Sequence, residues 1–136
     1  DYGGLGYNYR MPSINAAIGI AQLKNLNFFL KTKKNIFNKY KEISKKFTEF
    51  DLIVEPKNCK SNYWLQGIIL KKNSLKYRNQ IIKFMNKNGI KSRPVWKLMH
   101  KIQYLKKFKH GDLSNSIRLE KKIINLPSGI GLIYDK

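Results

Sequence analysis

Residues 6–23 read Gly-Tyr-Asn-Tyr-Arg-Met-Pro-Ser-Ile-Asn-Ala-Ala-Ile-Gly-Ile-Ala-Gln-Leu, a polar loop that runs directly into a helix of small residues. Pro12 suits the first turn of this helix, because its missing N–H needs no partner there. Every alanine of the chain lies in the helix, together with one glycine: Ala16, Ala17, Gly19 and Ala21. We expect these small side chains to allow close approach of another backbone, with the loop placed to touch a ligand.

The rest of the chain predicts further helices and short strands. Apolar residues at helical spacing indicate helices over residues 28–47, from Ser74 to about residue 88, and from Asp112 or Ser114 to about residue 122. Runs of aromatic and β-branched residues indicate strands over residues 63–70, 90–95 and 123–126. Gly89 sits where a helix C-terminal cap belongs. Helices packed on a small, short-stranded sheet make an α+β fold.

Composition limits the classes of protein that this chain can be. Its 136 residues suit one domain, and an apolar content of 42% is enough for a core. No apolar run is long enough for a transmembrane helix, so no membrane partner is predicted. Cys59 is the only cysteine, which excludes an internal disulfide and fits a cytoplasmic location. The opening Asp-Tyr-Gly-Gly-Leu-Gly reads as the middle of a loop, so we expect a piece of a larger protein.

The formal net charge of +20 raises the alternative of a non-catalytic basic interaction or nucleic-acid-binding module. The charge comes from 24 lysines and only four arginines, and the lysines are spread from Lys24 to Lys136. Dedicated nucleic-acid surfaces also use arginine, whose planar fork grips phosphate and guanine. The pattern therefore favours a solvated basic surface over a nucleic-acid site, and it draws attention to the few arginines.

Two clusters of residues can carry chemistry. In the N-terminal loop, the side-chain amide of Asn8 can donate a hydrogen bond to a phosphate oxygen, and Arg10 follows closely. The alternatives are a turn in which Asn8 bonds its own backbone, and a surface ion pair for Arg10. The second cluster is Arg93, Trp96 and His100, beyond a predicted strand, where tryptophan can cover a sugar or base ring. Its alternative places Trp96 in the core and makes His100 a satisfied surface residue.

Other kinds of site find little support in the sequence. No metal site is predicted, because zinc needs three or four convergent ligands and His100, His110 and Cys59 make no such group. No nucleophile with a base and no paired carboxylates stand out. The first glycines match neither a dinucleotide fingerprint nor a phosphate loop.

Taken together, these segments resemble the DegT/StrS family of nucleotide-sugar aminotransferases, which are pyridoxal-phosphate enzymes of aspartate-aminotransferase fold. The resemblance rests on the opening loop and helix and on three later motifs: Ser61-Asn62-Tyr63-Trp64-Leu65, Arg93-Pro94-Val95-Trp96 with His100, and Ile124-Asn125-Leu126-Pro127-Ser128. It covers nearly the whole chain. The motifs are most similar to the branch that aminates UDP-linked 4-keto-6-deoxy-HexNAc sugars for legionaminic-acid-type or exopolysaccharide synthesis.

The resemblance is to the C-terminal part of such an enzyme only. It implies that residues 1–27 form an interface loop and helix joining a large domain, and that residues 28–136 form the C-terminal small domain. The lysine that forms the Schiff base is expected upstream of Asp1, so no catalytic residue is assigned in this chain. We therefore expect the chain alone to be inactive, and a regulatory domain that kept the fold without the chemistry is an alternative.

The family also implies roles for individual residues. Asn8 is expected to reach across a homodimer interface to the phosphate of pyridoxal 5'-phosphate in the neighbouring subunit. Arg10 is expected near the diphosphate of the nucleotide sugar, and Arg93, Trp96 and His100 are expected to line the substrate side. The implied amino donor is glutamate, and the implied acceptor is a nucleotide-linked 4-keto sugar.

Overall fold

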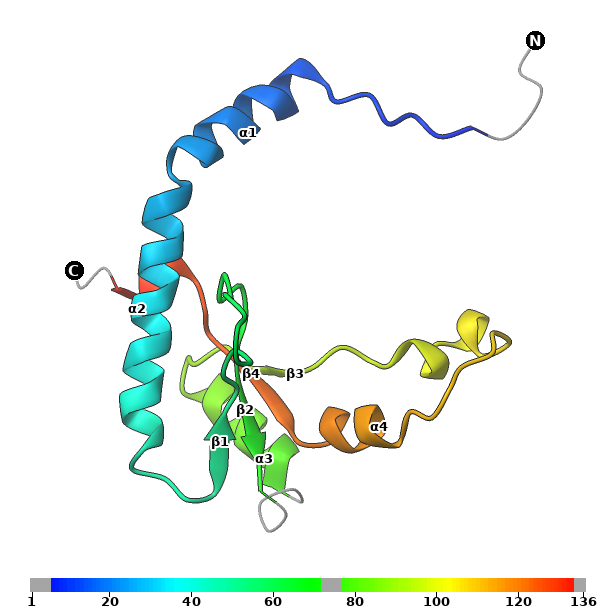
Figure 1. The fold of residues 1–136 in the computed structure, drawn as a ribbon. Helices are drawn as coiled ribbons and strands as arrows, with labels where there is room; N and C mark the ends of the chain where they lie inside the picture. The colour runs from blue at the N-terminus through cyan, green and yellow to red at the C-terminus, as the bar shows by residue number, and fades with distance from the viewer. Residues whose placement is uncertain (1–5, 72–76, 134–136) are drawn as a thin grey trace.

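The computed structural model describes residues 6–71 and 77–133, and it consists of helices on a small sheet (Figure 1). The helices and strands, in chain order, are α1 (Ser13–Lys24), α2 (Leu26–Ser44), β1 (Phe50–Leu52), β2 (Gln66–Leu70), α3 (Arg78–Lys87), β3 (Arg93–Pro94), α4 (Ser114–Glu120) and β4 (Ile123–Leu126). Short 3₁₀ segments complete the order: η2 (Met99–Lys101), η3 (Gln103–Leu105) and η4 (Ile130–Ile133). This arrangement confirms the predicted α+β fold.

The described strands form one antiparallel sheet in the order β1-β2-β4-β3. Ile68 of β2 faces Ile124 of β4, and Leu70 of β2 faces Phe50 of β1. Because side chains alternate along a strand, these residues share one face of the sheet. Ile68, Leu70 and Ile124 are buried there and make the hydrophobic core.

Helices α2 and α3 both cover this core face. Ile81 of α3 packs against the core strands, and an apolar pocket of about 630 Å³ lies between the two helices and the sheet. Helix α2 is also tied to the chain beyond β4, because the Tyr40 hydroxyl donates to the Pro127 carbonyl at 2.8 Å. The opposite face of the sheet carries Asn125 and its register partner Arg93, which places one predicted site residue away from the helices.

Strand β2 is shorter than predicted. It begins at Gln66 rather than at Tyr63, because the side chains of Ser61 and Asn62 accept the backbone N–H groups of Tyr63 and Trp64. Tyr63 also has a φ of +50°, which lies far from the values of a β-strand. Local side-chain bonds therefore hold a turn where the aromatic run predicted a strand.

The two edge strands depart further from the prediction. Strand β3 shrinks from the predicted residues 90–95 to Arg93–Pro94, and it lies at a sheet edge, where a missing proline N–H costs little. Strand β1 is absent from the strands predicted from the sequence, which is a correction. It is three residues long with the exposed Asp51 at its centre, so it leaves no clear pattern. The predicted cap of α3, Ser74, lies outside the described residues.

The predicted helices are confirmed, with small shifts at their ends. Gly89 ends α3 as expected, with a φ of +77° in the left-handed region. Its N–H donates to the Asn86 carbonyl at 3.1 Å, and the Ile90 N–H donates to the Met85 carbonyl at 2.9 Å. These bonds form a Schellman motif, which satisfies carbonyls that the helix itself leaves free.

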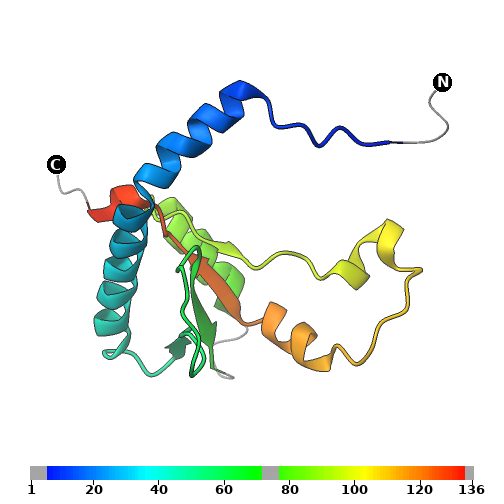
Figure 2. The same cartoon turned by 45° about the horizontal axis from the view of Figure 1, so that its top comes forward.

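Helix α1 projects from the end of α2 away from the sheet, as Figure 1 and Figure 2 both show. None of its residues is buried. Four large apolar side chains on it are exposed: Ile14, Ile18, Ile20 and Leu23. A Cβ added at Gly19 would meet nothing within 4 Å. The small-residue helix therefore presents an open apolar surface, although no helix of the described ranges has the length and apolar character to cross a membrane.

Alanine at Gly89 and at Gly19 should change stability in opposite directions. Gly89→Ala puts a Cβ into the left-handed region, which should lower the free energy of unfolding by about 1 kcal/mol. Gly19→Ala places its methyl group in open space within a helix and should raise it by roughly 0.5–1 kcal/mol. Urea unfolding followed by circular dichroism measures both, and a neutral Gly89→Ala variant would contradict the capping role.

Candidate functional site

Asn8 and Arg10 lie on the exposed segment that leads into α1. The Asn8 Oδ1 atom accepts the backbone N–H of Arg10 at 3.0 Å, so the predicted alternative of a local turn is present. That bond uses only the oxygen of the amide. Within residues 6–71 and 77–133, the Asn8 Nδ2 group has no hydrogen-bond partner and Arg10 has no ion pair, so both keep donors free for an anion.

Arg93, in the edge strand β3, and Trp96, which follows this strand, lie together at the edge of the sheet. The Cζ atom of Arg93 lies 5.5 Å from the centre of the Trp96 ring, which is a cation–π contact. The Trp96 side chain is 59% exposed, so the alternative that placed it in the core is wrong. The structure therefore brings these two predicted residues together at one surface.

Trp64 joins this surface from a different part of the chain. Its ring centre lies 5.8 Å from that of Trp96, with the planes tilted by 34°, and its side chain is 61% exposed. We call Trp64 and Trp96 the indole pair. Sequence reasoning placed Trp64 within a family motif and gave it no role. A usable signal was its rarity, because the chain has only these two tryptophans.

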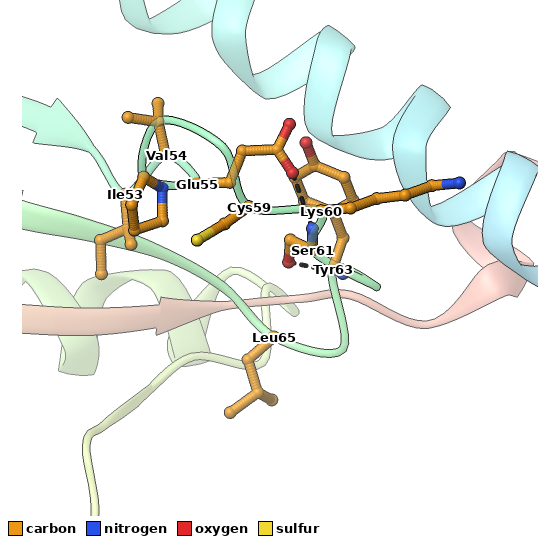
Figure 3. Close-up of a pocket in the computed structure, with 9 residues that line it drawn as sticks. Ile53, Val54, Glu55, Cys59, Lys60, Ser61, Tyr63 and Leu65 are labelled. Atoms are coloured by element: carbon orange, nitrogen blue, oxygen red, sulfur yellow. Dashed lines mark hydrogen bonds between the residues drawn. The ribbon is translucent and has the colours of Figure 1, made fainter.

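A small pocket in the loop before β2 helps to fix the turn that presents Trp64. The pocket has a volume of about 270 Å³, and Figure 3 labels residues that line it: Ile53, Val54, Glu55, Cys59, Lys60, Ser61, Tyr63 and Leu65. Glu55 Oε2 accepts the backbone N–H of Ser61 at 2.7 Å, and this bond is the main reason that the pKa of Glu55 lies below its usual value. The bond closes the loop, so the turn that follows begins from a fixed point.

Tyr63 anchors the same turn from the inside. Its buried ring lies 4.5 Å from the Phe37 ring, and its hydroxyl accepts the Lys34 ammonium at 2.5 Å. That bond raises the pKa of Lys34. The next residue, Trp64, donates its N–H to Asn62 Oδ1 at 3.0 Å. Because the Tyr63 side chain points into the protein, the side chain of the next residue, Trp64, points out to the surface.

A polar pocket of about 350 Å³ adjoins Arg93. It lies between β3, the end of β4 and the start of β2, and seven residues line it: Leu65, Lys91, Ser92, Arg93, Asn125, Leu126 and Ser128. Its charged residues are Lys91 and Arg93, so its lining carries positive charge without a carboxylate. A pocket of this kind suits an anionic group.

His100 lies in an arm formed by residues 96–112, which begins at Trp96 and extends sideways from the sheet in Figure 1. It is partly buried, and its ring centre lies 5.3 Å from that of His110. In the described part of the chain, no ring contact or hydrogen bond links His100 to Arg93 or Trp96. Of the predicted substrate residues Arg93, Trp96 and His100, the first two contact each other, whereas the His100 ring contacts that of His110.

Glu120 fastens this arm to the body. The Lys101 ammonium donates to Glu120 Oε2, and the Leu98 N–H donates to Oε1 at 3.4 Å. Arg78 Nη1 donates to the Glu120 backbone carbonyl at 2.6 Å. The hydrogen bond from Lys101 is the largest cause of a pKa of Glu120 below its usual value. The ion pair between Lys101 and Glu120 thus anchors the arm, and both side chains are partly buried.

The N-terminal segment and the indole pair are not brought together in one copy of the chain. Both views show residues 6–12 projecting far from the sheet edge that carries β3 (Figures 1 and 2). The described residues also contain no group of three or more His, Cys, Asp or Glu side chains placed to hold a metal ion. The candidate site therefore has two separate parts, each rich in donors for anions.

Comparisons with known proteins agree on one family. The chain matches the model of the DegT/DnrJ/EryC1/StrS aminotransferase family over residues 2–136. It is similar to the GDP-perosamine synthase of Vibrio cholerae, with 33% identity over 136 residues, which cover 97% of this chain and 36% of that protein. The chain thus spans about a third of the length of this relative.

Solved structures confirm the fold class. Helicobacter pylori PseC, an aminotransferase involved in the biosynthesis of pseudoaminic acid, matches with a TM-score of 0.84 at 23% identity, over 97% of this chain and 36% of that one. The E. coli GDP-4-keto-6-deoxy-D-mannose-3-dehydratase with bound hydrated PLP matches with a TM-score of 0.80 at 27% identity, over 92% of this chain and 33% of that one. Both matches cover about a third of the other chain.

Glu120→Gln should destabilise the chain at neutral pH, and the difference should shrink in acid. The folded-state pKa of Glu120 lies below its ordinary value of 4.5, so its stabilising effect is complete above that pH and is lost as the pH falls through the folded pKa. Thermal unfolding followed by circular dichroism, from neutral pH down to about pH 3, measures the difference.

The control for this prediction is Glu42→Gln. That change removes an exposed ion pair with Lys45 one turn away and should alter stability little at any pH. A difference between wild type and Glu120→Gln that stays constant across the whole pH range would contradict the anchoring role of the Glu120 carboxylate.

Proposed function

The chain belongs to the DegT/DnrJ/EryC1/StrS aminotransferase family, and from this premise we propose that it is the C-terminal segment of a pyridoxal-phosphate-dependent aminotransferase. The enzyme transfers the amino group of glutamate to a nucleotide-linked 4-keto-6-deoxy sugar for surface polysaccharide or glycan synthesis in the cytoplasm. The observation that carries the proposal is the family match across residues 2–136, which contains both parts of the candidate site. The UDP-HexNAc branch remains the predicted substrate class.

Dehydration of the same kind of sugar is the second candidate. It is favoured by the likeness to the E. coli 3-dehydratase, whose name specifies a GDP-linked 4-keto-6-deoxy sugar. Amination has broader support, because the family model is that of aminotransferases and the V. cholerae relative matches at higher identity over more of this chain. Both candidates share the 4-keto-6-deoxy substrate, so they differ in the product rather than in what must be bound.

The donors on the N-terminal segment fit an anionic cofactor. Asn8 keeps its Nδ2 group free while its oxygen shapes the loop, so it can donate to the phosphate of pyridoxal 5'-phosphate held by a neighbouring subunit. Arg10 adds a guanidinium beside it, suited to a substrate diphosphate. When bound, the cofactor supplies an electron sink for the carbanion of the amino-transfer reaction. The lysine that works with it belongs to the part of the enzyme upstream of this chain.

Helix α1 supports a homodimer with a shared site. Its apolar side chains lie on opposite sides of the helix, with Ile14 and Ile18 on one side and Ile20 and Leu23 on the other, and all of them are exposed. A helix with large apolar side chains exposed on two opposite sides needs cover on both of those sides. A second subunit packed against α1 would provide that cover, and it would also bring Asn8 to the cofactor of that subunit.

The full-length enzyme should convert glutamate and a UDP-linked 4-keto-6-deoxy-HexNAc into 2-oxoglutarate and the 4-amino sugar in equal amounts. Mass spectrometry of the sugar and an assay of 2-oxoglutarate measure this directly. Loss of the 3-hydroxyl group without gain of nitrogen would instead assign the dehydratase reaction. Failure of UDP-, GDP- and dTDP-linked 4-keto sugars alike to react would overturn the proposal.

Mixed dimers test whether Asn8 acts across the interface. Asn8→Ala should weaken binding of pyridoxal phosphate by roughly 10- to 100-fold, as expected for a hydrogen bond to a charged group. In a dimer of one Asn8→Ala subunit and one subunit without the Schiff-base lysine, a shared site leaves one active centre complete. Absorbance of the bound cofactor and the rate of the mixed dimer measure this.

The control is Asn15→Ala, an exposed asparagine on α1 with no assigned role. It should leave cofactor affinity unchanged. A mixed dimer as inactive as its two parent variants would show that Asn8 serves its own subunit, which contradicts the proposed arrangement.

A further inference from the structure

We propose that the indole pair is a stacking platform for the nucleobase of the nucleotide sugar, with its diphosphate held beside it by Arg93 and Lys91. This inference rests on the proposed function, which supplies the class of ligand, and it adds Trp64 and Lys91 to the substrate residues. It is carried by three observations on the structure: the geometry of the two rings, the charge next to them, and the rigid support beneath Trp64.

The two rings form an open surface and leave no slot between them. Their centres are 5.8 Å apart and their planes are tilted by 34°, so no third ring fits between them. Both side chains nevertheless remain about three-fifths exposed, with 61% for Trp64 and 59% for Trp96. Two large aromatic rings left in water side by side are a favourable surface for stacking a flat heterocycle.

Positive charge lies directly beside this surface. Arg93 contacts the Trp96 ring and also lines the polar pocket of about 350 Å³ together with Lys91. No ion pair engages Arg93 or Lys91 within the described ranges, so both cations are available to a ligand. An aromatic surface next to unpaired cations matches a nucleoside diphosphate, which joins a flat base to two charged phosphates.

Trp64 is held in place by its backbone. Its carbonyl accepts the Ser128 hydroxyl at 3.0 Å and the Lys33 ammonium at 3.2 Å. Its N–H donates to Asn62 at 3.0 Å. Both polar groups of its backbone are thus bonded, and little ordering of the main chain is needed when a ligand binds. Fixed support of this kind under an exposed indole favours a binding role over that of a chance surface residue.

Tryptophan fluorescence tests the platform directly, because Trp64 and Trp96 are the only tryptophans of the chain. UDP and GDP should quench the emission in a saturable manner, whereas inorganic pyrophosphate or N-acetylglucosamine alone should leave it nearly unchanged. In the single-tryptophan variants Trp64→Phe and Trp96→Phe, the remaining indole should still respond. Trp64→Ala should weaken UDP binding by about 5- to 150-fold, the range for loss of one stacked base.

The matched control is Tyr104→Ala, which removes an exposed aromatic ring from η3 in the arm. It should bind UDP as the wild type does. Emission that ignores UDP and GDP would mean that another polypeptide segment covers the indole pair, and quenching of Trp96 alone would remove Trp64 from the site. Quenching by N-acetylglucosamine together with no quenching by UDP would overturn the assignment of the indole pair to the base.

A kinetic measurement on the full-length enzyme separates this inference from the proposed function. Trp64→Ala should raise the KM for the nucleotide sugar by a similar factor and leave the KM for glutamate unchanged. If the Trp64→Ala enzyme aminates the sugar with an unchanged KM, the proposed function stands and the stacking platform is contradicted. If the protein binds UDP through both indoles but aminates no sugar, the stacking platform stands and the proposed function is contradicted.

Discussion

The Lys33 ammonium joins three separate parts of the chain at one point. From α2 it donates to the Trp64 carbonyl at 3.2 Å, in the turn before β2, and to the Ser128 carbonyl at 2.8 Å, beyond β4. Burial lowers the pKa of this lysine, and the two carbonyls replace part of its water. The long helix, the central strands and the exposed Trp64 are thereby held in one frame, so the site depends on a residue that only looks like one more surface lysine in the sequence.

The elements with strong local patterns could be predicted, and those that depend on distant contacts could not. The helix beside Pro12 and the cap at Gly89 follow from local chemistry, and both are present, although Pro12 lies at the N-cap rather than in the predicted first turn. The pairing of Trp64 with Trp96 depends on the positive φ of Tyr63 and on how β2 and β3 flank β4. Neither property leaves a periodic signal in the sequence. The motif of residues 61–65 could therefore be recognised, but the contact of Trp64 with Trp96 could not be predicted.

The two parts of the candidate site differ in how they are supported. Trp64 is held by bonds to residues distant in the sequence, whereas within the described residues the Asn8 side chain bonds only the N–H of the nearby Arg10. A residue with purely local support takes its final position from whatever it binds. This division suits a site in which a rigid domain recognises the nucleotide and a projecting segment closes on the cofactor of another subunit.

The exposed apolar surface of α1 also has a consequence for the life of the protein in a cell. Under the proposed homodimer, a copy that has not met its partner exposes the isoleucine and leucine side chains of α1, which form the kind of surface that chaperones and proteases recognise. Survival of each new copy then rises with the number of copies already present, because pairing follows mass action. Under the proposed dimer, low expression would therefore reduce the amount of assembled protein in two ways: fewer chains are made, and each chain has a shorter lifetime.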